Sequence, residues 1–134
     1  MSTRDSKTYT IMTAKGATGI GNNIFCKDFT HAILHFDTDG GGDAALTAKL
    51  VGSVKEDCPD FTAAQTMSNS YDFIQMKDLE DGSSIDGDIG FVVVTADNHR
   101  IFEVNVNGLN WLNVRITART QGELTVFVTL YNSQ

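Results

Sequence analysis

Two acidic, glycine-punctuated runs in this sequence contain residue types that could bind a hard cation. The first is DTDGGGD at residues 37–43, and the second is LEDGSSIDGDIG at residues 79–90. Calcium in proteins takes roughly six to eight oxygen ligands, mostly from carboxylates and carbonyls. The carboxylates that could supply such ligands to one shared site are Asp37, Asp39, Asp43, Asp86 and Asp88. The two interpretations of these runs are a calcium site and tight turns between strands.

Neither run matches a familiar calcium-binding motif. In an EF-hand loop that starts at Asp37, the twelfth position needs a bidentate Glu, but this sequence has Ala48 there and no helical pattern on either side. A calcium-binding nonapeptide repeat does not fit either, because the glycines are consecutive and nothing repeats. Consecutive glycines suit a turn that needs positive φ angles. We therefore expect turns, and a metal site only if the first run meets Asp86 or Asp88 in space.

The histidines and cysteines do not predict a zinc site or a covalent catalyst. His31 and His35 have the spacing of a helical zinc pair, but their local pattern is that of a strand, where four residues span about 13 Å. Cys26 and Cys58 lack CxxC spacing, so we expect free thiols unless the fold brings their Cα atoms within about 7 Å. No GxSxG nucleophile motif occurs, and His99 has no recognisable partner. We expect no enzymatic activity and no bound cofactor.

Composition describes an acidic globular chain of 134 residues with a net charge of -7 and a pI of about 4.7. The ten basic residues are scattered, which argues against nucleic-acid binding because that needs clustered Lys and Arg. No apolar run approaches the roughly 20 residues that a membrane span needs, and the first residues lack a signal-peptide core. We expect neither nucleic acid nor a membrane as a partner.

Alternation of apolar and polar residues, the signature of half-buried strands, recurs along the chain, whereas helical periodicity is nearly absent. Every second residue is apolar in residues 112–118 and again in residues 124–130, with a turn at Gln121-Gly122 between them. We expect these segments to form a hairpin with one apolar face. Residues 99–106 add a strand, and the continuous apolar run at residues 89–96 predicts a central strand covered on both sides. These four strands should be mostly sequential antiparallel neighbours, with a crossover between two sheets as the alternative.

The N-terminal half adds expected strands and one long connection. The strands are predicted at residues 7–13, 23–26, 30–36, 45–54 and 71–79. Residues 55–70 form the connection, which we expect to be an irregular loop or a short helical turn. About eight or nine short strands with Gly, Asp and Asn turns predict an all-β antiparallel sandwich, jelly-roll-like and without substantial helix, with a closed barrel as the alternative. We expect residues 1–22 to form a flexible N-terminal arm and residues 23–134 to form a single sandwich domain.

Three aromatic residues are candidates for a contact surface. Trp111, the only Trp, has the parity of the polar face of its strand, and Phe127 and Tyr131 have the outward parity of theirs. Exposed aromatic side chains on a sandwich suit either stacking on sugar rings or burial in a subunit contact. We expect the subunit contact, or else simple packing of these side chains at the rim of the sandwich.

The C-terminal sequence FEVNVNGLNWLNVRITARTQGELTVFVTLYN resembles small β-sandwich structural proteins of tailed-bacteriophage particles. The shared pattern is an Asn-Gly turn, a strand of the form W-x-x-V-R-I-T-A, a Gly turn, and a last strand of the form x-V-x-V-x-L-x-N. The upstream segments DFIQMKDLEDGSSIDGDIG and FDTDGGGDAALTAKLVGSV are similar to segments of such proteins as well. The resemblance therefore covers most of the chain after residue 35.

The resemblance implies a non-enzymatic virion protein, either a capsid decoration (cement) protein at joints between capsid subunits or an accessory head or tail protein. It implies the major capsid protein or other virion proteins as partners, assembly as a homo-oligomer, and a place on the virion after synthesis in the host cytoplasm. A protein that binds only the assembled shell stabilises it by linkage. The alternative is a carbohydrate-binding or adhesin-like module, with Trp111 as the platform and calcium in the acidic runs.

Overall fold

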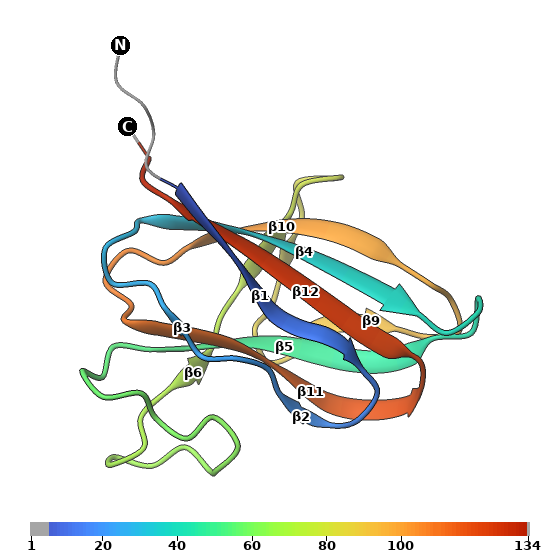
Figure 1. Ribbon diagram of the computed structural model, residues 1–134, viewed down its shortest axis with the longest axis horizontal. Coiled ribbons are helices and arrows are strands. Elements are labelled where there is room, and N and C mark those ends of the chain that lie inside the picture. Colours follow the sequence, from blue (N-terminus) through green and yellow to red (C-terminus); the bar gives the residue numbers. More distant parts are fainter. Residues whose placement is uncertain (1–5, 134) are drawn as a thin grey trace.

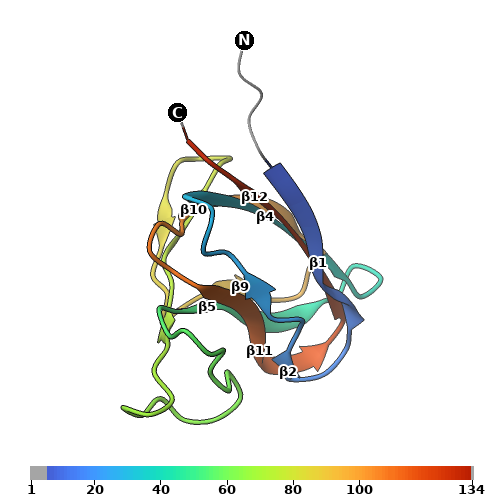
Figure 2. The ribbon, with the colours of Figure 1, turned by 60° about the vertical axis from the view of Figure 1, so that its left-hand side comes forward.

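The computed structural model describes residues 6–133, and every regular element within that range is a strand. The strands form two antiparallel sheets of six strands each, which pack face to face (Figure 1, Figure 2). The predicted all-β antiparallel sandwich is thereby confirmed. No helix in the described range is long and apolar enough to cross a membrane.

The strand order is that of a jelly roll. Sheet A contains, in spatial order, β1 (Ser6–Lys15), β12 (Glu123–Tyr131), β4 (His31–Asp39), β10 (His99–Asn105), β7 (Met76–Asp78) and β8 (Ser84–Ile85). Sheet B contains β2 (Gly19–Ile20), β11 (Trp111–Gln121), β5 (Ala45–Ser53) and β6 (Asp72–Phe73); β3 (Ile24–Phe25) also pairs with β11, and β9 (Phe91–Val93) also pairs with β5. The long strands β4, β5, β10, β11 and β12 alternate between the two sheets, as the jelly roll requires.

The core lies between the inner faces of the sheets and follows the alternation in the sequence. β4 and β12 bury every second side chain, including Leu34, Phe36 and Val126. Phe36, Phe91 and Phe102 pack edge to face, with ring centroids 5.5 Å, 5.3 Å and 5.6 Å apart. Burial of one such side chain contributes about 2–3 kcal/mol to stability.

The expected hairpin between residues 112–118 and 124–130 is wrong in its pairing. β11 pairs with β5 in sheet B, and β12 pairs with β1 and β4 in sheet A. The chain passes from one sheet to the other at Gly122, whose φ is 95°. A Cβ at Gly122 would lie 2.8 Å from the Ala44 Cβ, so this corner needs glycine for both conformation and space. The crossover, which the sequence left open as an alternative, is what the chain adopts.

The apolar run at residues 89–96 is not the doubly covered central strand that the sequence predicted. Only Phe91–Val93 form a strand, and within the described residues β9 pairs with β5 alone. Val92 and Val94 are 48% and 69% exposed. The run therefore lies at an edge of sheet B.

Two further expectations differ from the structure. Residues 6–15 of the expected N-terminal arm form β1, which pairs along β12 (Figure 1) and buries Ile11 and Met12. Residues 1–5 of that arm lie outside the described residues. Residues 6–133 contain twelve strands, more than the expected eight or nine. Two-residue strands such as β2 and β8 are too short to show alternation, and residues 71–79 divide between β6 and β7, which belong to different sheets.

Candidate interaction surfaces

Trp111 lies on the outer face of sheet B, where a long loop covers it. The loop follows β5 and runs over this face, as the green segment at the lower left of Figure 1 shows. Its residue Phe61 is fully buried and packs edge to face on Tyr71, with centroids 5.3 Å apart. Trp111 packs against this small second core and against Phe25, 5.0 Å away, and its Nε1 donates to the Glu56 carbonyl at 3.1 Å. Trp111 therefore helps to fix the loop.

Phe127 and Tyr131 lie on the opposite side of the molecule, on the outer face of sheet A. We call this surface the sheet A face. It consists of the outward side chains of β4 from His31 to Asp37, of β10 from His99 to Asn105, and of β12 from Thr125 to Tyr131. Phe127 pairs with His35, which pairs in turn with Ile101, so these three form a row across the strands. Phe127 is 40% and Ile101 is 42% exposed. Of the three predicted contact residues, the structure brings Phe127 and Tyr131 together on one strand and places Trp111 elsewhere.

All three histidines of the chain lie on the sheet A face. His31 stacks on Tyr131 with ring centroids 5.5 Å apart. His35 Nε2 and His99 Nδ1 lie 3.0 Å and 2.7 Å from the same oxygen, Asp37 Oδ1. Parity could have placed His31 and His35 on one face of their strand, but the approach of His99 depends on the non-sequential pairing of β10 with β4. The centre of this face is thus the row of Phe127, His35 and Ile101, while His31 and His99 lie at opposite ends of the face.

The first acidic run forms a loop that Asp97 fixes. The Asp97 carboxylate accepts hydrogen bonds from the amides of Gly40 and Gly42, each at 2.8 Å. Asp39 accepts a longer one from Gly41 at 3.3 Å. Gly41 and Gly42 have φ angles of 68° and 94°, so the consecutive glycines do serve the turn. Asp43, also in this loop, is exposed.

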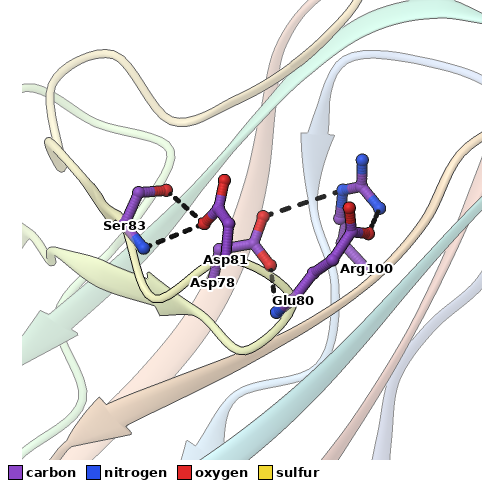
Figure 3. A network of polar contacts seen from close by, with 5 residues as sticks. All are labelled: Asp78, Glu80, Asp81, Ser83 and Arg100. Atoms are coloured by element: carbon purple, nitrogen blue, oxygen red, sulfur yellow. Dashed lines mark hydrogen bonds and ion pairs between the residues drawn. The ribbon is translucent and has the colours of Figure 1, made fainter.

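The second acidic run is a series of turns stabilised by its own donors (Figure 3). The Ser83 hydroxyl and amide donate to Asp81 at 2.7 Å and 2.9 Å, which lowers the pKa of the Asp81 carboxyl. The Asp86 carboxylate accepts a hydrogen bond from the Asp88 amide at 2.8 Å. These carboxylates therefore have hydrogen-bond donors without a cation.

One arginine connects the second run to sheet A. Arg100 Nε on β10 lies 3.7 Å from Asp78 Oδ2, and Arg100 Nη1 donates a hydrogen bond to the Glu80 carboxylate (Figure 3). Asp78 is 8% exposed and also accepts a hydrogen bond from the Glu80 amide at 2.9 Å. The network holds the turn after β7 against β10.

The two acidic runs do not converge. Asp37 and Asp39 line a shallow depression of about 540 Å³ together with Asp97, His99 and Glu123. Asp86 lines a different one of about 440 Å³. Across residues 6–133 no three His, Cys, Asp or Glu side chains are grouped so that they could hold a metal ion. The predicted shared site of Asp37, Asp39, Asp43, Asp86 and Asp88 is not assembled.

Both cysteines are free thiols. Cys26 is fully buried, and burial raises its pKa from 9.0 to about 12. Partial burial raises the pKa of Cys58 as well. A raised pKa suppresses the reactive thiolate, so neither cysteine has the environment of a nucleophile.

Comparison with known proteins yields structural likeness without sequence likeness. No protein-family model and no curated protein matches the sequence. The structure of SPBc2 prophage-derived protein YomS matches with a TM-score of 0.72 at 9% sequence identity, over 98% of this chain and 96% of YomS. The fold is therefore one that a phage-derived protein adopts. The structure of PBSX exported protein XepA matches with a TM-score of 0.70 at 11% identity over 98% of this chain but 39% of XepA, so this chain spans about two fifths of that protein.

Proposed function

We propose that this protein is a non-enzymatic structural component of a tailed-phage particle, which decorates the capsid at joints between capsid subunits. Two findings support the proposal, the whole-length likeness to the prophage-derived protein YomS and the partly exposed aromatic centre of the sheet A face. The second carries it, because exposed aromatic and aliphatic side chains grouped on one face are typical of a protein contact.

The contact surface in this proposal is the row of Phe127, His35 and Ile101 together with Tyr131. Aromatic residues near the centre of a contact contribute most of its binding energy. The contact binds the major capsid protein or another virion protein, and the protein does so as a homo-oligomer. Binding only to the assembled shell then stabilises the shell by mass action.

Trp111 gives little support to the carbohydrate-binding alternative. Its ring packs edge to face with Phe25 and against the small second core, and its Nε1 donates to the Glu56 carbonyl, so the ring already has several partners within the chain. A stacking platform needs an open ring face.

XepA is an exported protein, and its structural likeness to this chain favours a second candidate function. In that case the chain is a phage-encoded protein that leaves the host free of the particle. The particle hypothesis and this candidate differ in where the protein is found after lysis.

Fractionation of a lysate separates the two candidates. Gradient-purified particles and the particle-free supernatant are both analysed by quantitative mass spectrometry. The proposal expects this chain in the particle fraction at a constant ratio to the major capsid protein. Its presence in the supernatant alone contradicts the proposal and supports the second candidate.

A further inference from the structure

The strand β9 is apolar and forms an edge of sheet B. Within the described residues it pairs with β5 on one side and with no strand on the other. The run at residues 89–96 has the composition of a strand covered on both sides. Ile89, Val92 and Val94 are nevertheless 61%, 48% and 69% exposed. An exposed apolar edge strand offers backbone donors and acceptors to another chain, and proteins usually protect such edges with charge or proline.

A groove adjoins this edge. It has a volume of about 440 Å³, and its lining comes from β8 and β10 of sheet A and from β9 of sheet B, so it opens between the two sheets. Its apolar lining includes Ile85, Ile89, Phe91 and Phe102. Phe91 and Phe102 are core residues, 5% and 0% exposed, so a side chain in the groove would contact the main core. We call this feature the β9 groove.

We propose that the β9 groove binds an extended segment of a partner protein, which adds to β9 as a further antiparallel or parallel strand. A strand presents alternate side chains to opposite faces. A strand added at this edge directs one set inward between the sheets, where apolar side chains contact Phe91 and Phe102, and the other set outward beside Val92, which also lines the groove. Main-chain hydrogen bonds supply affinity, and the groove supplies selectivity for apolar residues at alternate positions.

The charge around the groove determines which residues of the partner segment flank its apolar positions. Arg100, the cation in the lining, is already paired with Asp78 and Glu80 (Figure 3). Asp86 lines the groove, and Asp88 follows it in the same exposed turn. Because Asp86 and Asp88 make the end of the groove at this turn negative, the partner segment carries Lys or Arg beside its apolar positions. A second copy of this chain fits less well, because its own β9 edge has the same acidic turn and its net charge is -7.

This inference does not rest on the proposed particle role, since a free protein with the same edge would bind the same class of segment. The test uses the full-length protein and a display library of random peptides. The library is first passed over immobilised Val92→Lys to remove peptides that bind elsewhere on the protein. The remaining peptides are then selected for binding to the wild type. Val92 is half-exposed, so this variant should fold, and circular dichroism verifies that it does. We expect enriched sequences with apolar residues at alternate positions and Lys or Arg at the flanks.

The matched control is Val54→Lys, the same substitution at a valine that is 66% exposed and lines a different depression. A synthetic consensus peptide should bind the wild type and Val54→Lys alike, and Val92→Lys about tenfold or more weakly. Proline at the centre of the peptide should abolish binding, because proline cannot donate a ladder hydrogen bond. Enriched peptides without alternation, or equal binding to Val92→Lys, would overturn the proposal. Dimerisation of the wild type that Val92→Lys abolishes in sedimentation would overturn it in favour of a second copy.

Discussion

Phe127 lies directly opposite His35 across the β12–β4 pair, on the outer face of sheet A, with its side chain two fifths exposed. The same strand β12 buries Val126 and Val128 completely, so its two faces differ sharply in environment. A phenyl ring in this position contributes less to folding than a fully buried one, and its exposed part is available for a contact.

Substitution of Phe127 should separate folding from binding. We expect Phe127→Ser to lower the free energy of unfolding by about 1–2 kcal/mol, because two fifths of the residue is solvated already. Phe36→Ala is the matched contrast on the neighbouring strand and should cost about 3–5 kcal/mol, because Phe36 is fully buried. Urea denaturation measures both. A loss at Phe127 as large as that at Phe36 would show that Phe127 belongs to the core.

The crossover at Gly122 should tolerate no side chain. Gly122→Ala combines a left-handed backbone with a Cβ 2.8 Å from the Ala44 Cβ, so we expect a loss of about 2–5 kcal/mol. Gly41→Ala is the control, because Gly41 also has a positive φ but open space around its Cβ, and its cost should be about 1–2 kcal/mol. Thermal unfolding gives the order of the two variants. Equal losses would show that the contact with Ala44 is unimportant.

Asp97 should stabilise the glycine loop in place of a metal ion. Removing the carboxylate in Asp97→Ala leaves the amides of Gly40 and Gly42 without their acceptor, and we expect a loss of about 2–3 kcal/mol. Asp43→Ala, at an exposed position of the same loop, should cost less than about 0.5 kcal/mol. Melting curves with excess calcium and with a chelator should coincide for the wild type. A rise of the melting temperature in calcium that depends on Asp37, Asp39 or Asp86 would restore the metal hypothesis.

Burial of Cys26 predicts a loss of stability at alkaline pH. The folded thiol keeps its proton to a pKa of about 12, while an unfolded thiol loses it near 9.0. The folded state therefore binds more protons in this interval, and stability must fall as pH rises from about 9 to 12. Cys26→Ala should show a shallower decline in the free energy of unfolding over that interval. An identical slope for both proteins would contradict the assignment, and the slope is informative even if the substitution lowers stability overall.

The alternation of apolar and polar residues predicted well where the long strands lie, but it predicted poorly which strands pair with each other. Residues 112–118 and 124–130 reveal which side chains face inward, but the same alternation serves two strands in one sheet or in facing sheets. Gly122 is equally suited to a hairpin turn and to a crossover, so only the three-dimensional contact with Ala44 decides between them. The run at residues 89–96 misled for a related reason, because composition alone cannot distinguish a strand buried in its own chain from an apolar edge.

The candidate sites show the same limit. The parity of Trp111 placed its side chain correctly on an outer face. The loop over that face contacts Trp111, for example through the Glu56 carbonyl, and no periodic pattern in the sequence encodes such contacts. Ligand counting argued against the familiar calcium motifs around Asp37. It could not reveal that Asp97, more than fifty residues away in the sequence, fixes the glycine loop. The grouping of the histidines likewise follows from the pairing of β10 with β4.

The most direct test of the proposed role is reconstitution on particles that lack this protein. Purified wild type and Phe127→Lys, shown by circular dichroism to fold alike, are each mixed with such particles and sedimented through a density gradient. The particle role through the sheet A face predicts that the wild type sediments with the particles at a saturable ratio and that Phe127→Lys stays in the free fraction. Wild-type protein that remains free at saturating particle concentration, or equal sedimentation of the two proteins, would contradict it.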